Sequence, residues 1–154
     1  MLSTIFPSRA PLDDLIVERR VPVRVLVVGD RSARRDDAVA VLGSDGCEVF
    51  TSEPDVAESA LPTLGVVDAL VLDVAIPDLD AFAMCRRLKF AQPASPILLL
   101  SSASASVDSW TPGLEAGADG YLKHPVGAIE LRAAVHALAR LRREETDRDR
   151  KSVV

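Results

Sequence analysis

The sequence predicts an α/β fold: a doubly wound, five-stranded parallel sheet flanked by five helices. Short, continuous apolar runs are typical of strands that are buried on both faces. The segments between these runs carry apolar residues at helical spacing. Such an alternation produces right-handed βαβ units and hence a parallel sheet. The chain has 154 residues, of which 48% are hydrophobic, so it is long enough for one sizeable core.

Three of the five predicted strands are strong, because they are continuous and rich in Val, Leu or Ile. These are "VRVLVV" at 23–28, "DALVLDV" at 68–74 and "PILLLS" at 96–101. The other two, "CEVFT" at 47–51 and "GYLK" at 120–123, are short.

Five helices are expected between and after these strands, at 32–46, 55–65, 79–90, 107–118 and 128–142. The second is weak and is expected to break or end near Pro62. The fourth is doubtful, because Pro112 removes an interior hydrogen bond. The last carries one apolar stripe, formed by Leu131, Val135, Leu138 and Leu141.

The two ends of the chain differ from this middle part. Residues 1–21 form an N-terminal extension without sustained periodicity, in which 13–20 could make a short helix. The domain is expected to span 22–142. Residues 143–154 form a charged tail, either a solvated helix end that frays or the start of a linker.

Composition excludes several classes of protein. The net charge of −5 argues against direct nucleic-acid binding, and no apolar run has the length of a membrane span. The N-terminus lacks the pattern of a signal peptide, so the expected location is the cytoplasm. Cys47 and Cys85 are not in metal or redox spacing and are interpreted as two reduced, partly buried thiols.

In parallel sheets of this kind the functional site lies beyond the carboxyl ends of the strands. The polar and special residues at these positions are Gly29, Asp30, Asp73, Ser101, Ser102, Lys123, His124 and Pro125. Two carboxylates and a hydroxyl at neighbouring strand ends suit a divalent cation and a phosphoryl group, because hard cations prefer oxygen ligands and a carboxylate can attack phosphorus.

The motifs "VLVVGD", "LVLDVAIPDLDAF", "PILLLSS" and "GLEAGADGYLKHPV" occur in this order before a closing amphipathic helix. Over residues 22–142 the chain resembles the receiver domain of two-component response regulators. The resemblance implies a flavodoxin-like sheet of order 2-1-3-4-5 and a phosphorelay signalling module rather than an enzyme. It also implies a sensor histidine kinase or phosphotransfer protein as phosphoryl donor and a downstream output domain or protein, and it allows a homodimer.

The resemblance assigns a role to each matching residue. Asp73 is the phosphoacceptor, and Mg²⁺ ligands come from Asp30, Asp73 and the backbone carbonyl of Ala75. Ser101 and Tyr121 form the switch pair.

The resemblance also assigns partners for the phosphoryl group at the ends of the fourth and fifth strands. His124 and Ser102 are expected to contact the phosphate or the carboxylate, and Pro125 follows a cis peptide bond, which X-Pro bonds adopt at low cost.

Two family positions are altered. Gly29 replaces the first acidic residue, and His124 replaces the lysine that precedes the proline. Lys123 is adjacent, but neighbouring strand residues point to opposite faces, so His124 is expected within a few ångströms of Asp73 and Lys123 is expected to point away. There is also one more residue between Ser101 and Gly117 than in most receivers, so the fourth helix is expected to be short or remodelled.

These replacements predict a weakened site with low Mg²⁺ affinity. Since a histidine is only partly charged near neutrality, phosphorylation is expected to weaken as pH rises.

Alternatives remain open at this stage. Asp73 could only end a strand, Asp30 could cap the first helix, and "ARRDDA" is interpreted as a solvated helix face. Besides a phosphorylated receiver, the chain could be a phosphorylation-independent interaction domain. A small α/β enzyme or flavin carrier is less favoured, because no glycine-rich phosphate loop or nucleophile elbow is present.

Overall fold

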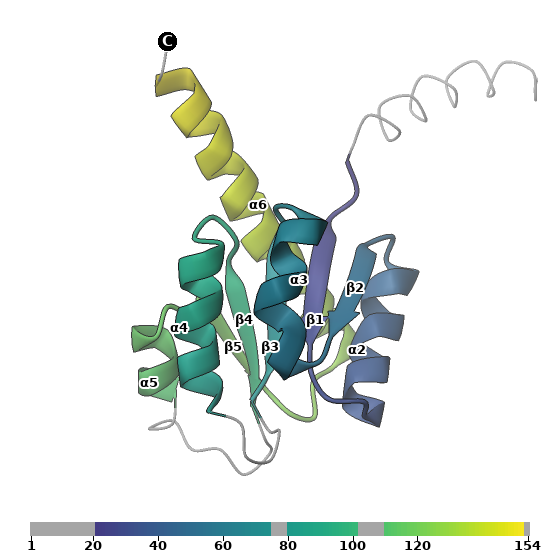
Figure 1. Ribbon diagram of the computed structural model, residues 1–154. Helices are drawn as coiled ribbons and strands as arrows, with labels where there is room; N and C mark the ends of the chain where they lie inside the picture. The colour runs from purple at the N-terminus through teal and green to yellow at the C-terminus, as the bar shows by residue number, and fades with distance from the viewer. Residues whose placement is uncertain (1–20, 75–79, 102–109, 153–154) are drawn as a thin grey trace, which may run out of the picture.

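The computed structural model describes residues 21–74, 80–101 and 110–152. Within these residues the strands form one five-stranded parallel sheet of order β2-β1-β3-β4-β5 (Figure 1). The predicted fold class and strand order are therefore confirmed. The short helix expected at 13–20 lies outside the described residues.

The strands begin and end within two residues of their predicted bounds. They are β1 (Arg24–Val28), β2 (Glu48–Ser52), β3 (Ala69–Asp73), β4 (Ile97–Ser101) and β5 (Gly120–Lys123). The helices of the described chain are α2 (Ala33–Ser44), α3 (Ala57–Leu64), α4 (Ala81–Ala91), α5 (Trp110–Glu115) and α6 (Ala128–Ser152), with a single 3₁₀ turn, η2, at Pro54–Val56.

Strand alternation divides the core into two layers. On β1, Val25 and Val27 pack with α2 and α6, whereas Leu26 and Val28 pack with α3 and α4. The β3 and β4 strands alternate in the same way, and the apolar residues of both strands are almost completely buried. The sheet is thus covered on both faces, as its continuous apolar strands predict.

Two of the helices contain a proline residue. α3 contains Pro62 but continues to Leu64 before ending at Gly65, which has φ of 74°. α5 has six residues in the described chain, from Trp110 to Glu115, and the segment just before it lies outside the described residues, so the expected shortening of the fourth helix stays a prediction. α5 packs tightly on the sheet, because a Cβ at Gly113 would lie 2.6 Å from Leu99 Cδ1.

α6 is ten residues longer than predicted, since it ends at Ser152 instead of residue 142. The charged tail is therefore a continuation of the last helix, and it projects beyond the body of the domain (Figure 1). Two interactions support the extension: Thr146 Oγ1 donates to the Arg142 carbonyl at 3.0 Å, and Arg143 is bonded to the body of the domain. Within the described chain, none of the helices combines the length and the apolarity that crossing a bilayer demands.

Candidate functional site

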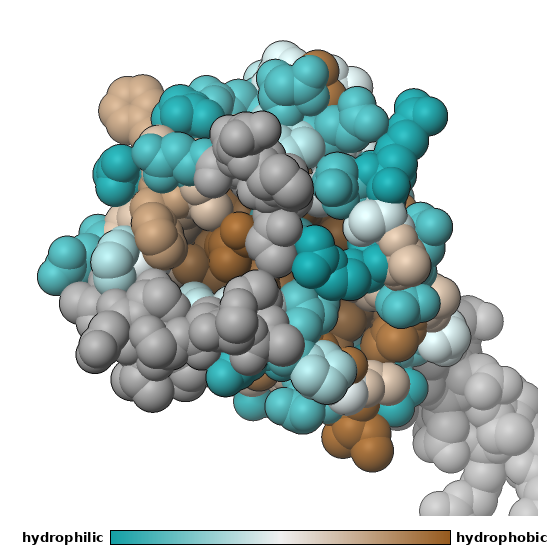
Figure 2. Space-filling model, turned by 90° about the horizontal axis from the view of Figure 1, so that it is seen from below, coloured by the Kyte–Doolittle hydropathy of each residue, from teal (hydrophilic) through white to brown (hydrophobic). Residues whose placement is uncertain are grey.

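The predicted site lies at the carboxyl edge of the sheet, the edge that Figure 2 faces. Asp73 ends β3 there and is 4% exposed. Its Oδ2 forms an ion pair with Nε of Arg34 at 3.2 Å. Arg34 belongs to the first turn of α2, which follows β1 after only a short connection, so the start of this helix lies over the strand ends.

Asp30 follows β1 at the same edge. Its Oδ1 is buried and has no hydrogen-bond partner in the part of the chain that the structure describes. The cap of α2 is Ser32 instead, whose side chain accepts a hydrogen bond from the backbone N–H of Arg35 at 3.3 Å. The interpretation of Asp30 as a helix cap is therefore wrong.

Gly29 lies directly beside Asp73. A Cβ built at Gly29 would be 3.7 Å from Asp73 Cβ, which is ordinary van der Waals contact. The backbone at Gly29 is fixed on both sides: its N–H donates to Ser52 O at 3.0 Å, and its carbonyl accepts from Arg35 Nη1 at 3.2 Å. Position 29 therefore accepts a Cβ without displacing Asp73.

The donor set fits a hard divalent cation. Asp30 offers a buried carboxylate oxygen to which no described residue hydrogen-bonds, and Asp73 offers a second carboxylate on the adjacent strand. Oxygen atoms of this kind are the ligands that Mg²⁺ prefers. The third predicted ligand, the carbonyl of Ala75, lies outside the described residues.

The two predicted switch residues lie on β4 and β5. Ser101 ends β4 and is completely buried. Tyr121 is partly buried and packs against the core layer of α3 and α4. Ser102, the other hydroxyl expected at this edge, lies outside the described residues.

The register of β5 separates His124 from Lys123. Lys123 is exposed and pairs with Ser101 across the sheet. His124 is half-buried, and its backbone N–H donates to Ser101 O at 3.2 Å. The peptide bond between His124 and Pro125 is cis.

His124 lines a groove of about 410 Å³ between α2 and α6, together with Arg34, Ala38 and Leu131. Its Nε2 is buried and makes no hydrogen bond within the described chain. The position of His124 agrees with the predicted face of β5, while its close approach to the Asp73 carboxylate stays a prediction. Among the described residues, Arg34 places a cation in contact with Asp73.

Arg34 and Arg35 are the site residues that sequence reasoning missed. The run "ARRDDA" was expected to be a solvated helix face, which is wrong for these two arginines, because one pairs with Asp73 and the other bonds Gly29. The two following residues, Asp36 and Asp37, are exposed as expected. The available signal for the two arginines was their position in the first turn of α2, since that turn lies over the carboxyl ends of the strands.

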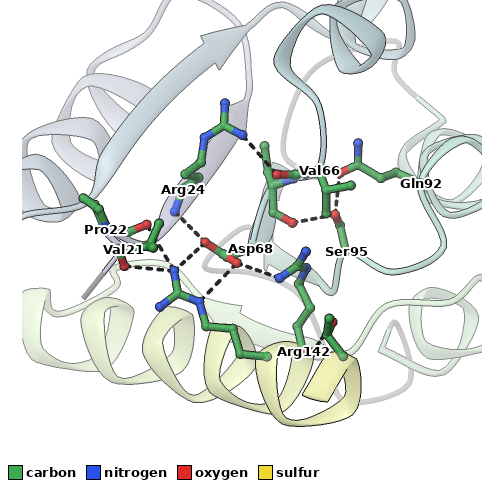
Figure 3. Close-up of polar contacts among 11 residues, drawn as sticks. Val21, Pro22, Arg24, Val66, Asp68, Gln92, Ser95 and Arg142 are labelled. Carbon is green, nitrogen blue, oxygen red and sulfur yellow. Dashed lines mark hydrogen bonds and ion pairs between the residues drawn. The ribbon is translucent and has the colours of Figure 1, made fainter. Parts of the chain in front are cut away.

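A second polar cluster occupies the opposite, amino-terminal edge of the sheet (Figure 3). Asp68, 6% exposed, directly precedes β3. Its Oδ1 accepts from Arg142 Nη1 at 2.9 Å, and its Oδ2 accepts from Arg143 Nη2 and from the backbone N–H of Arg24, both at 2.9 Å. Arg143 also donates to the carbonyls of residues 21 and 22. This cluster fixes α6 to the body of the domain.

Comparison with known proteins identifies the family of the chain. The family model described as "Response regulator receiver domain" matches residues 25–136. The response regulator MprA of Mycobacterium sp. (strain KMS) is 40% identical over 120 residues, which cover 78% of this chain and 52% of that protein. The chain thus spans about half the length of the curated relatives that it matches.

Solved structures agree. A putative response regulator from Chloroflexus aurantiacus J-10-fl superposes with a TM-score of 0.70 at 29% identity, covering 77% of this chain and 98% of that one. A CheY-like receiver domain protein from Methanospirillum hungatei JF-1 has a TM-score of 0.72 at 21% identity, with 81% and 99% covered, and shows the same fold. The chain therefore belongs to the response regulator receiver domain family, whose members are signalling modules and not enzymes.

Proposed function

We propose that the chain is an atypical receiver that accepts a phosphoryl group at Asp73 from a sensor histidine kinase or a phosphotransfer protein. The proposal places it in the cytoplasm, as one member of a phosphorelay that acts on a downstream output domain or protein. The observation that carries it is the juxtaposition at the carboxyl edge of a buried Asp73 and an Asp30 oxygen that lacks a hydrogen-bond partner.

The reaction is a transfer between two protein side chains. An Asp73 carboxylate oxygen attacks phosphorus, the new O–P bond forms, and the bond from phosphorus to the donor histidine nitrogen breaks. Anionic charge gathers on the phosphoryl oxygens and must be met by cations and hydrogen-bond donors. Asp30, Asp73 and the Ala75 carbonyl would hold Mg²⁺, which when bound would supply part of this positive charge.

Arg34 supplies a second cation from the protein itself. Its guanidinium lies 3.2 Å from Asp73 and stays charged at any physiological pH. In a site that lacks one carboxylate at Gly29 and the usual lysine at His124, this arginine compensates for part of the lost charge. It also competes with Mg²⁺ for the same carboxylate, which is a second reason to expect weak metal binding.

Ser101, Tyr121 and His124 complete the proposed site. The buried hydroxyl of Ser101 turns toward the phosphoryl group, and Tyr121 follows it inward. His124, which directly follows β5, is expected to approach the Asp73 carboxylate as a partner of the phosphoryl group. His124→Lys then places the family's usual cation there and increases labelling, whereas Lys123→Ala, at an exposed position, changes little.

The decisive experiment is labelling by acetyl phosphate or a kinase at increasing Mg²⁺ concentration. The wild type is expected to be labelled once, and Asp73→Asn is expected to abolish the label. Asp36→Asn, at an exposed position of α2, is the matched control and should be labelled like the wild type. Persistent labelling of the Asp73→Asn variant would show that Asp73 is not the phosphoacceptor.

A phosphorylation-independent interaction domain is the second candidate. The ion pair between Arg34 and Asp73 favours it, because a cation already neutralises the acceptor without any phosphoryl group or metal. In that case the wild type stays unlabelled even at high Mg²⁺, and a partner binds wild type and Asp73→Asn with equal affinity.

A further inference from the structure

Three side chains with metal-binding atoms converge at the amino-terminal edge of the sheet, away from Asp73. They are Asp45 at the end of α2, Cys47 just before β2, and His136 on α6. A carboxylate oxygen, the thiol sulfur and an imidazole nitrogen all lie within 4.8 Å of one another. α2 and β2 are joined at the end of the molecule from which α6 projects (Figure 1).

The backbone fixes two of these residues in place. Asp45 is the C-cap of α2 and its N–H donates to Leu42 O at 3.2 Å. Gly46 then adopts φ of 85°, and the N–H of Cys47 returns to the same Leu42 carbonyl at 3.1 Å. This tight turn, typical of helix ends with glycine in the left-handed region, holds Asp45 and Cys47 in a defined relation.

His136 brings the third atom from a residue that is 91 positions away from Asp45 in sequence. Its Nε2 is in direct contact with Asp45 Oδ2. The preceding residue, Val135, is fully buried, so the helix that carries the imidazole is firmly seated on the sheet. The three atoms therefore approach one another through packing of the fold.

The chemical types of these three ligand atoms indicate which metal ion they would bind. Mg²⁺ and Ca²⁺ take oxygen ligands, whereas a set of thiolate, imidazole and carboxylate is typical of Zn²⁺. A zinc ion at about 2.0–2.3 Å from each atom requires the Asp45 oxygen and the His136 nitrogen to move apart. These side chains are 31% and 42% exposed, so both have room to move.

We propose that Asp45, Cys47 and His136 form a tetrahedral Zn²⁺ site, with water in the fourth position. Cys47 binds as thiolate and releases its proton to solvent, while His136 binds through the neutral imidazole. The ion links the end of α2, the start of β2 and α6. This site is independent of phosphoryl transfer at Asp73, and neither proposal needs the other.

The chain offers a matched control for each ligand, because it contains only two cysteines and two histidines. The full chain is stripped of metal with a chelator and titrated with Zn²⁺ and with Co²⁺. We expect one ion per chain, a thiolate-to-cobalt charge-transfer band, and a higher Tm with Zn²⁺, because an ion that binds only the native state stabilises it. Mg²⁺ in excess should not displace the ion.

Cys47→Ser, His136→Gln and Asp45→Asn should each weaken Zn²⁺ binding. For the cysteine and histidine variants we expect a loss of more than about 100-fold, since even residues outside the coordination sphere cost roughly 10–100-fold. Cys85→Ser, His124→Gln and Asp37→Asn should bind like the wild type. Circular dichroism of each metal-free variant verifies that it is folded.

Two results would overturn the proposal. One is a wild type that binds no zinc above the level of a generic surface site, which leaves Asp45 and His136 as a plain ion pair. The other is binding that survives in Cys47→Ser or His136→Gln, or cobalt binding without the charge-transfer band, which excludes the thiolate as a ligand.

Discussion

Asp68 and Asp73 are two buried aspartates at opposite ends of the same strand, and their surroundings differ. Asp68 accepts hydrogen bonds from two arginines and one backbone N–H. Asp73 is paired with Arg34, whose side chain is 39% exposed, and the neighbouring Asp30 keeps a buried oxygen that has no hydrogen-bond partner among the described residues. Both oxygens of the Asp68 carboxylate accept hydrogen bonds, whereas one oxygen of Asp30 does not.

The loop before β3 adds further polar contacts at the amino-terminal edge. At the amino-terminal edge, the loop before β3 is bonded by Arg24, Gln92 and Ser95, which contact backbone atoms of residues 64–67 (Figure 3). A buried carboxylate whose two oxygens are both hydrogen-bonded makes a structure rigid and specific. The comparison therefore indicates that Asp68 stabilises the fold, whereas the chemistry proposed for the carboxyl edge needs a carboxylate that can still take a ligand, although both aspartates are buried and face arginine.

The largest expected effect is on stability, and it separates the two aspartates. Asp68→Asn removes the charge that two part-buried arginines share, so we expect a loss of roughly 3 kcal/mol in the free energy of unfolding. Asp73→Asn should change it by less than about 1 kcal/mol, because the partner arginine is substantially solvated. Urea unfolding of both variants measures the difference, and equal losses would contradict the division of roles.

A smaller loss is expected when one arginine of the Asp68 cluster is removed. Arg143→Ala loses the contact with Asp68 and two bonds to backbone carbonyls, so we expect a loss of about 1–2 kcal/mol and faster hydrogen exchange after residue 143. Arg148→Ala, exposed on the same helix, is the control and should be close to neutral. If both variants behave alike, the cluster does not anchor α6.

At the carboxyl edge, Gly29→Asp should increase Mg²⁺ affinity. A Cβ fits there at ordinary van der Waals distances, and the additional carboxylate is expected to tighten binding roughly tenfold, or about 1.4 kcal/mol. Gly43→Asp is the matched control, because nothing lies within 4 Å of a Cβ at that helix position. A titration in which both variants match the wild type would argue against this metal geometry.

Arg34→Gln should have a weaker effect on the same titration. Removing the competing cation is expected to tighten Mg²⁺ binding only a few-fold, because exposed ion pairs contribute about 0–1 kcal/mol. At saturating Mg²⁺ the variant should nevertheless be labelled more slowly, since the phosphoryl oxygens lose a permanent cation. Arg86→Gln, exposed on α4, should leave both readouts unchanged.

The smallest effect concerns Cys85, a buried thiol on α4. Burial raises the pKa of the Cys85 thiol to about 11, with Lys89 opposing the shift. Because the native pKa lies above the unfolded value, the associated stability is present below pH 9 and is lost as pH rises toward 11. The free energy of unfolding should therefore fall more steeply over this range in the wild type than in Cys85→Ala. Parallel curves would show that Cys85 does not titrate there.

Much of the fold could be predicted from the sequence, because apolar runs such as "VRVLVV" report burial on both faces without reference to distant residues. The position of Asp73 at the sheet edge follows from the same logic. The opposite faces of Tyr121 and Leu122 on β5 also follow, since side chains alternate along a strand.

The arginines show why the remainder could not be predicted. Arg34 and Arg35 have long side chains, and whether such a chain extends into solvent or folds back depends on the groups around it. Arg142 and Arg143 meet Asp68 across 74 and 75 residues, a pairing that no local pattern contains. For the same reason, α6 was predicted to end ten residues too early.

The extension of α6 has a mechanical consequence. Beyond Arg142 the helix continues for about 15 Å, at 1.5 Å per residue, and Asp68 holds its base. When this helix tilts as a rigid rod about its contacts with Asp68, a tilt of about 10° displaces its end by roughly 2–3 Å. A small rearrangement at the amino-terminal edge of the sheet therefore becomes a larger displacement at the end of the helix.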